Sequence, residues 1–233
     1  KEKKWWTFWV KNFDNERLKE DIESLTNFYN NQGFRDFRVL NETIEVNKDN
    51  ATLSLNLKIE EGPKYKYSEF RFEDNRVAST EELQRLLNLK KGEVFSKEQF
   101  DKSVYENMMS IYQNKGYIFS NVTPVITPVG ENSLDILFKF NEGNKVYIDQ
   151  IFVSGNEKTR ENVIRRELKI YPGDVFNRSK LMRSQRDIWI LNYFDNVIPD
   201  VTPVSDDKVS LDFLVEEKQS TQRINANLGF TGE

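Results

Sequence analysis

Residues 62–75 of the chain read Gly62-Pro-Lys-Tyr-Lys-Tyr-Ser-Glu-Phe-Arg-Phe-Glu-Asp-Asn75, and a matching pattern returns 81 positions later, from Gly143 to Asn156. Both copies lead without a gap to a second match, Gly92-Glu-Val-Phe95 and Gly173-Asp-Val-Phe176. A period of this length marks a structural repeat, which has to be settled before local elements are assigned. The 233 residues therefore predict a series of small domains, about three in number.

The first element of the repeated unit is a strand with a defect in its alternation. Apolar residues alternate over 65–72 and 146–153, but the phase slips at Ser68-Glu69 and at Asp149-Gln150. A slip of one residue moves the following side chains to the other face of a sheet, so we predict a β-bulge at each place.

Two helices are expected next in each unit. The first begins near Ser79 in one copy and near Thr159 in the next, because both residues are good N-cap types before an apolar stripe. The second begins after Asp14, Ser96 and Asn177, three further N-cap types. Its apolar residues recur at helical spacing, which indicates a face packed on a sheet.

Two strands complete the unit. An extended stretch occupies 37–46, 119–129 or 194–204, and a strictly alternating run follows each of them, as is typical of a half-buried strand. The runs are Leu53, Leu55, Leu57 and Ile59; Leu134, Ile136, Phe138 and Phe140; and Val209, Leu211, Phe213 and Val215. We predict an α+β fold of tandem β-α-α-β-β repeats, each with a three-stranded mixed sheet and two helices on one face.

The repeats predict where the chain divides. Trp5 falls opposite Leu87 and Leu168 of the later copies, so we expect the chain to begin inside a repeat, without its first strand and most of its first helix. The aromatic segment 1–10 is then a helix end packed on a core, with a carbohydrate-binding or membrane-interface patch as the alternative. The predicted domains are 1–62, 63–142 and 143–217, followed by 218–233 as a linker and the start of a further strand.

Composition excludes several classes of protein. Cysteine and histidine are absent, which removes disulfides, the usual zinc sites and Cys–His or Ser-His-Asp nucleophiles. An enzyme that uses carboxylates alone is left open by the composition but is disfavoured, and we expect no metal, no cofactor and no enzyme activity. The net charge of −4, with both signs interspersed, offers no basic field for nucleic acid.

The last copy resembles the POTRA family. The residues that carry the resemblance are Gly155-Asn156, Ile164-Arg-Arg-Glu-Leu168 and Pro172-Gly-Asp-Val-Phe176, followed by Leu191-Asn-Tyr-Phe-Asp-Asn-Val197 and Leu211-Asp-Phe-Leu-Val-Glu-Glu217. They look like the last POTRA domain of the BamA family of outer-membrane assembly factors. Residues 1–62 and 63–142 are similar to the third and fourth POTRA domains of that family.

The resemblance implies a location at the periplasmic face of the outer membrane of a Gram-negative bacterium. It implies unfolded outer-membrane proteins and accessory lipoproteins as partners, and the chain's own membrane β-barrel, whose first strand would begin with Ile224, Ala226, Leu228 and Phe230. The POTRA region of a TamA-type or two-partner secretion transporter is the alternative. A KH-like nucleic-acid module is disfavoured because none of the repeated units contains a GXXG loop and the net charge is negative.

An open sheet edge can bind an incoming strand through its unpaired N–H and C=O groups. Proline blocks such pairing, and it occurs at Pro124, Pro128, Pro199 and Pro203 in the later copies but not in 37–46. The alternative is that these prolines only bend their strands. The predicted client-binding edge comprises Phe37, Arg38, Val39, Leu40, Asn41, Glu42, Thr43 and Ile44.

Arg165 and Arg166 form the second candidate site. Their place near a helix end suits the helix dipole, and a docking contact for a partner lipoprotein is the other interpretation.

Overall fold

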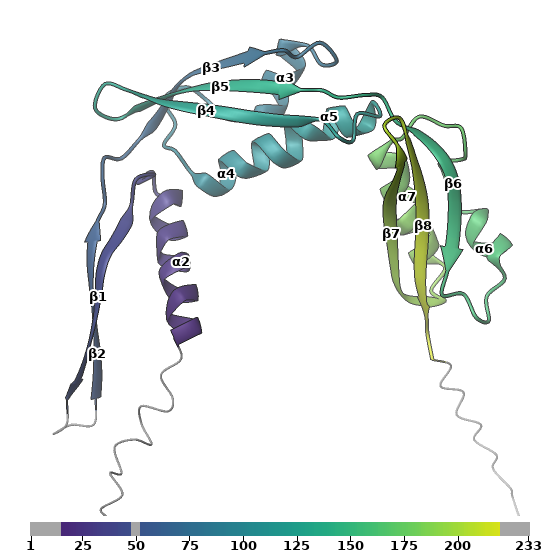
Figure 1. Ribbon diagram of the computed structural model, residues 1–233, viewed down its shortest axis with the longest axis horizontal. Coiled ribbons are helices and arrows are strands. Elements are labelled where there is room, and N and C mark those ends of the chain that lie inside the picture. The colour runs from purple at the N-terminus through teal and green to yellow at the C-terminus, as the bar shows by residue number, and fades with distance from the viewer. Residues whose placement is uncertain (1–14, 48–51, 220–233) are drawn as a thin grey trace, which may run out of the picture. The chain divides into compact units, whose positions relative to one another are not determined.

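The computed structural model describes residues 15–47 and 52–219, which belong to two compact units (Figure 1). One unit lies within Lys1–Tyr112 and Ser120–Gly143, the other within Gln113–Phe119 and Asn144–Glu233. We call 15–62 the first repeat, 63–142 the second and 143–217 the third. The predicted aromatic segment 1–10, the N-cap Asp14 and the strand expected at 224–230 lie outside the described residues.

The first repeat contains one helix and two strands among its described residues. These are α2 (Asn15–Asn31), β1 (Arg38–Asn47) and β2 (Thr52–Glu60), and the two strands pair antiparallel. Leu18 and Phe37 are buried, and the Phe37 ring stacks on Tyr29 with 4.1 Å between ring centroids.

The second and third repeats share one architecture. The second comprises β3 (Lys66–Glu73), α3 (Thr80–Leu87), α4 (Lys97–Asp101), η1 (Lys102–Met108), α5 (Met109–Asn114), β4 (Asn121–Val129) and β5 (Ser133–Asn141). The third comprises β6 (Tyr147–Ser154), α6 (Glu161–Arg165), α7 (Arg178–Ile190), β7 (Phe194–Ser205) and β8 (Lys208–Glu217). The sheet orders are β3-β5-β4 and β6-β8-β7, with the first strand parallel and the other outer strand antiparallel to the central one.

The buried face of each central strand carries the helices. On β8, the alternating Val209, Leu211, Phe213 and Val215 are at most 1% exposed, and they share one core cluster with Ile164 of α6 and Ile188 of α7. Period-two burial on the strand places the apolar side chains on one side of the sheet, where both helices lie. The predicted α+β fold with three-stranded mixed sheets is confirmed.

Both predicted bulges are present, at the register shifts Tyr67/Glu69 and Ile148/Ile151. The N-caps Ser79, Ser96 and Asn177 are also confirmed, since each side chain accepts a hydrogen bond from the N–H three residues on.

The cap predicted at Thr159 is wrong. Helix α6 begins after Arg160, with no side-chain cap. The carboxylate of Glu217, at the end of β8, accepts from the N–H groups of Lys158 (2.9 Å) and Thr159 (2.6 Å), which precede the helix. These donors lower the pKa of Glu217 below its usual value. Glu217 thus ties the turn before α6 to the end of β8.

The π-helical segment η1 was not predicted. Helix α2 has 17 residues, whereas the corresponding run in the second repeat, Lys97–Asn114, has 18. A π-turn accommodates one extra residue without moving the ends of a helix. None of the helices in 15–47 and 52–219 is long and apolar enough to cross a bilayer.

Candidate strand-binding edges and exposed surfaces

Strand register identifies equivalent positions in the three repeats. Glu42 pairs with Leu57, Pro124 with Phe138 and Pro199 with Phe213. Leu57, Phe138 and Phe213 occupy the same place in the three alternating runs. Because a proline has no N–H to give to the central strand, its nitrogen faces the outer edge. The backbone N–H of Glu42 therefore points to the outer edge of β1, at a position where both β4 and β7 have proline.

The outer edge of β4 has lost part of its donor row. The backbone N–H positions of Val122, Pro124, Ile126 and Pro128 point to this outer edge, and the two prolines have no N–H to offer there.

The outer edge of β7 is closed further by side chains. Pro199 and Pro203 remove two outward donors. At Val197, the N–H donates to Asn196 Oδ1 (3.0 Å) and the carbonyl accepts from Gln185 Nε2 of α7 (2.7 Å). An incoming strand finds few unpaired groups here.

The outer edges of β3 and β6 are covered at their starts by the segments 92–95 and 173–176. The Tyr67 N–H donates to the Glu93 carbonyl (2.9 Å), and the Gly92 N–H donates to the Tyr67 carbonyl (2.7 Å). Ile148 makes the same pair of bonds with Asp174 and Gly173, each 2.8 Å. These are the segments whose sequence repeats.

The predicted client-binding residues lie on or beside β1. Phe37 precedes the strand and is buried (5% exposed), so its side chain belongs to the core. Arg38 pairs with Glu60 across to β2 (2.6 Å). The register shift between Val39 and Asn41 places a bulge at Leu40. The remaining members, Arg38, Val39, Leu40, Asn41, Glu42, Thr43 and Ile44, share one proline-free strand.

The structure separates the roles of the two predicted docking arginines. Arg165 pairs with Glu161 (2.6 Å), and its Nη2 donates to the carbonyl of Ile151 on β6 (2.9 Å). Arg166 contacts Glu167 (3.1 Å) with its side chain 61% exposed. Arg165 therefore ties α6 to the sheet, and Arg166 is the more accessible of the two.

One exposed surface was missed by sequence reasoning. Met182, Arg186, Trp189 and Tyr193 recur at helical spacing along α7 and the turn after it, and Trp189 is 58% exposed. The helix buries Leu181, Ser184 and Ile188 on its other side. The signal in the sequence was a second large-residue stripe on a short helix that already had a core-facing stripe. We call this set the α7 face.

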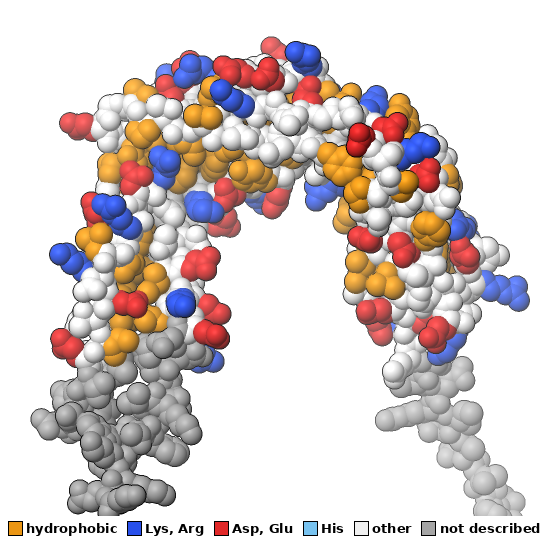
Figure 2. Space-filling view, viewed as in Figure 1, with side chains coloured by type: hydrophobic (Ala, Val, Ile, Leu, Met, Phe, Trp, Pro, Cys, Tyr) orange, Lys and Arg blue, Asp and Glu red, His pale blue; other side chains and the backbone are white. Residues whose placement is uncertain are grey.

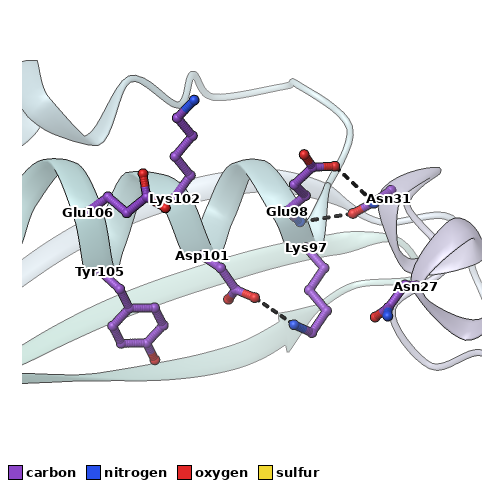
Figure 3. Close-up of a pocket in the computed structure, with 8 residues that line it drawn as sticks. All are labelled: Asn27, Asn31, Lys97, Glu98, Asp101, Lys102, Tyr105 and Glu106. Carbon is purple, nitrogen blue, oxygen red and sulfur yellow. Dashed lines mark hydrogen bonds and ion pairs between the residues drawn. The ribbon is translucent and has the colours of Figure 1, made fainter. Parts of the chain in front are cut away.

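A groove of about 630 Å³ lies in the first unit between α2 and the helix that starts at Lys97 (Figure 3). Figure 3 shows Asn31 reaching Glu98 and Lys97 paired with Asp101. The lining residues are Asn27, Asn31, Lys97, Glu98, Asp101, Lys102, Tyr105 and Glu106. On the face seen in Figure 2, cationic and anionic side chains are interspersed, with hydrophobic side chains between them.

Comparison with known proteins gives a consistent result. The model of the POTRA family, described as surface antigen variable number repeat, matches residues 10–62, 65–143 and 146–218. The chain is 30% identical over 231 residues to the outer membrane protein assembly factor BamA of Neisseria meningitidis, covering 97% of the chain and 29% of that protein. It is 28% identical over 225 residues to a putative outer membrane protein assembly factor of Treponema pallidum, covering 94% and 27%. The chain thus spans less than a third of these relatives.

Among solved structures, the chain is similar to POTRA domains 3–5 of Haemophilus influenzae BamA. The TM-score is 0.74 at 19% identity, with 88% of this chain and 82% of that chain covered. A structure of Haemophilus ducreyi BamA lacking POTRA domains 1–3 matches with a TM-score of 0.56 at 22% identity, covering 66% and 30%. At these identities the two structures support the fold.

Proposed function

Because the chain belongs to the POTRA family, we propose that it is the periplasmic binding region of an outer-membrane β-barrel assembly protein of the BamA type. In this proposal it is not an enzyme. It holds unfolded outer-membrane proteins by strand addition and docks accessory lipoproteins of the assembly complex. The names of its relatives support this assignment. The POTRA region of a TamA-type or two-partner secretion transporter remains the alternative.

The observation that carries the client-binding proposal is the backbone of β1. At the register position of Glu42, an outward N–H is available where β4 and β7 present Pro124 and Pro199. A hydrogen bond of this type contributes about 0.5–1.5 kcal/mol, and strand addition repeats it along the edge without requiring a particular client sequence. A sequence-tolerant edge fits many clients.

The test introduces into β1 the proline that the equivalent strands β4 and β7 already contain. Glu42→Pro removes the outward donor at a position where two other repeats fold with proline, and Glu42→Ala removes only the side chain. The probe is a fluorescent peptide, Lys-Val-Thr-Phe-Thr-Val-Thr-Phe-Thr-Lys, with the alternation of a barrel strand. We expect Glu42→Pro to weaken binding about tenfold, equivalent to about 1.4 kcal/mol, and Glu42→Ala to leave it unchanged.

Equal binding by the proline variant, with its circular dichroism spectrum unchanged, would refute the β1 assignment. Thr43→Pro supplies a further control. The backbone N–H of Thr43 faces β2, so proline there should disrupt the pairing of β1 with β2 instead.

We infer that an accessory protein with an acidic rim docks on the α7 face. Exposed Trp, Tyr, Met and Arg are the residues enriched in protein interfaces. Helix α7 carries four cationic residues and one acidic residue, which favours an acidic partner. Titration with purified accessory lipoproteins of the complex should show a loss of about tenfold or more for Trp189→Ala, with Arg166→Glu as the comparison. A loss confined to Arg166→Glu would place docking on α6.

A further inference from the structure

We propose that Asn31 and Asn114 cap helices of the repeat that follows them, and that the Asn31 cap fixes the joint between the first repeat and the second. The capping is independent of which clients or partners the chain binds. At the first joint, Asn31 is the last residue of α2. Its Oδ1 accepts from the backbone N–H of Glu98 (2.9 Å), the second residue of α4 (Figure 3).

The first turn of α4 is therefore capped from two sides. Ser96, its own N-cap, accepts from the Gln99 N–H (3.4 Å), and Asn31 accepts from the Glu98 N–H. Asn31 Nδ2 also approaches the Glu98 carboxylate (3.4 Å). The first N–H groups of a helix have no partner within the helix. One repeat thus supplies an acceptor that the next repeat lacks.

Backbone contacts two residues later strengthen the same joint. The Gly33 carbonyl accepts from the Tyr65 N–H at 2.8 Å. Gly33 has φ +102°, and a Cβ added there would lie 2.6 Å from Val94 Cγ1. This close approach requires glycine at the helix end.

Side chains close the rest of the joint. The Tyr65 hydroxyl donates to Asp36 Oδ2 (2.7 Å), and Lys64 Nζ lies 5.7 Å from the centre of the Phe34 ring. Each contact links the first repeat to the start of the second, so the short connection at Gly62-Pro63 is not the sole constraint between them.

The second unit repeats this arrangement around Asn114. Its Oδ1 accepts from the Ser179 N–H (2.8 Å), and its carbonyl accepts from Nδ2 of the N-cap Asn177 (2.8 Å). The Gly116 carbonyl accepts from the Val146 N–H (2.9 Å), and a Cβ on Gly116 would lie 2.5 Å from Val175 Cγ1. The same set of contacts thus occurs twice, which supports a common structural role for the two asparagines.

The turn after α7 departs from the pattern. Leu191 stands where Asn31 and Asn114 stand, and leucine has no acceptor in its side chain. The backbone bond of the joints has a counterpart here, from the Lys218 N–H to the Tyr193 carbonyl (2.9 Å). Within 15–47 and 52–219, the asparagine cap therefore occurs at the two places where one repeat meets the next.

Distance measurement between spin labels tests the proposal directly. The chain has no cysteine, so Glu23→Cys on α2 and Glu131→Cys in the β4–β5 turn give a single labelled pair, both at exposed sites. We expect Asn31→Ala to broaden the distance distribution about twofold or more. Asn27→Ala is the matched control, because Asn27 is an exposed asparagine on α2 four residues earlier that lines the same groove.

Amide exchange provides the second readout. Asn31→Ala should speed exchange of the Glu98 N–H about tenfold, and Asn114→Ala should do the same for Ser179. Asn31→Asp combined with Glu98→Gln exchanges the carboxylate and the amide, and should restore both exchange and distance. An unchanged distribution with unchanged exchange at Glu98 overturns the proposal, as does equal broadening by Asn27→Ala.

Discussion

A single methyl group at Gly155 should destabilise the third repeat more than the same group at Gly173. The two glycines have nearly the same backbone, with φ +83° and +86°. A Cβ on Gly155 would lie 2.1 Å from the carbonyl oxygen of Val215 on β8, whereas a Cβ on Gly173 meets nothing within 4 Å. Positive φ alone costs a non-glycine residue about 1–2 kcal/mol. Gly173→Ala should therefore lose about that amount.

Gly155→Ala adds the displacement of a paired strand. Overpacking of this kind costs about 1–3 kcal/mol beyond the backbone term, and the colliding atom belongs to the main chain, which cannot rotate away. The total should reach about 2–5 kcal/mol.

Hydrogen exchange read by mass spectrometry on β8 peptides measures this difference within one repeat. In the regime where exchange follows the opening equilibrium, every 1.4 kcal/mol is about tenfold in rate. Exchange of β8 should therefore be about 5- to 150-fold faster in Gly155→Ala than in Gly173→Ala. Equal rates would show that the turn relaxes freely, and would refute the claim that close approach to β8 dictates glycine at this position.

Two further expectations concern the third repeat. The lowered pKa of Glu217, caused first by its hydrogen bond from the Thr159 N–H, means that its contribution to stability is present above the usual glutamate pKa of about 4.3 and is lost as the pH falls through the folded value. Exchange protection of the Thr159 amide should fall with acid in the wild type and be lower but nearly independent of pH in Glu217→Gln; parallel pH profiles would contradict this. Arg165→Met should lower the unfolding temperature, because it leaves the Ile151 carbonyl without its donor, whereas Arg166→Met should stay within about 0.5 kcal/mol of wild type. Equal effects of the two substitutions would contradict the structural role of Arg165.

Local patterning made most of the fold predictable. The alternation on β5 and β8, the phase slips in β3 and β6 and the N-cap Ser79 all depend on residues within a few positions of one another. The cap at Thr159 failed because α6 begins after Arg160, and the Thr159 N–H is held by Glu217, which lies 58 positions away in the chain. The π-helical segment was missed because its apolar residues, spaced four apart, also fit the face of an ordinary α-helix.

The candidate site could be predicted from the sequence only where it depends on residue type and not on contacts between distant segments. Proline in β4 and β7 is visible in the sequence, so the contrast with β1 could be drawn from it. The equivalence of Glu42 with Pro124 needs strand register, which depends on pairing between distant segments. The role of Arg165 depends on a carbonyl of β6 at a bulged strand, and a helix-dipole argument gives no hint of that contact.

The segment that repeats most closely has two structural tasks at once. In 92–95, Glu93 pairs with β3 and covers its edge, while Val94 packs against Gly33 of the preceding repeat. In 173–176, Asp174 and Val175 do the same for β6 and Gly116. Pairing with the neighbouring strand constrains the backbone of this segment, and contact with the preceding repeat constrains its valine. A substitution in the segment therefore disturbs either the strand edge or the joint. The contact with the preceding repeat accounts for the valine in both copies, positive φ (+86°) accounts for the glycine, and burial in the core accounts for the phenylalanine.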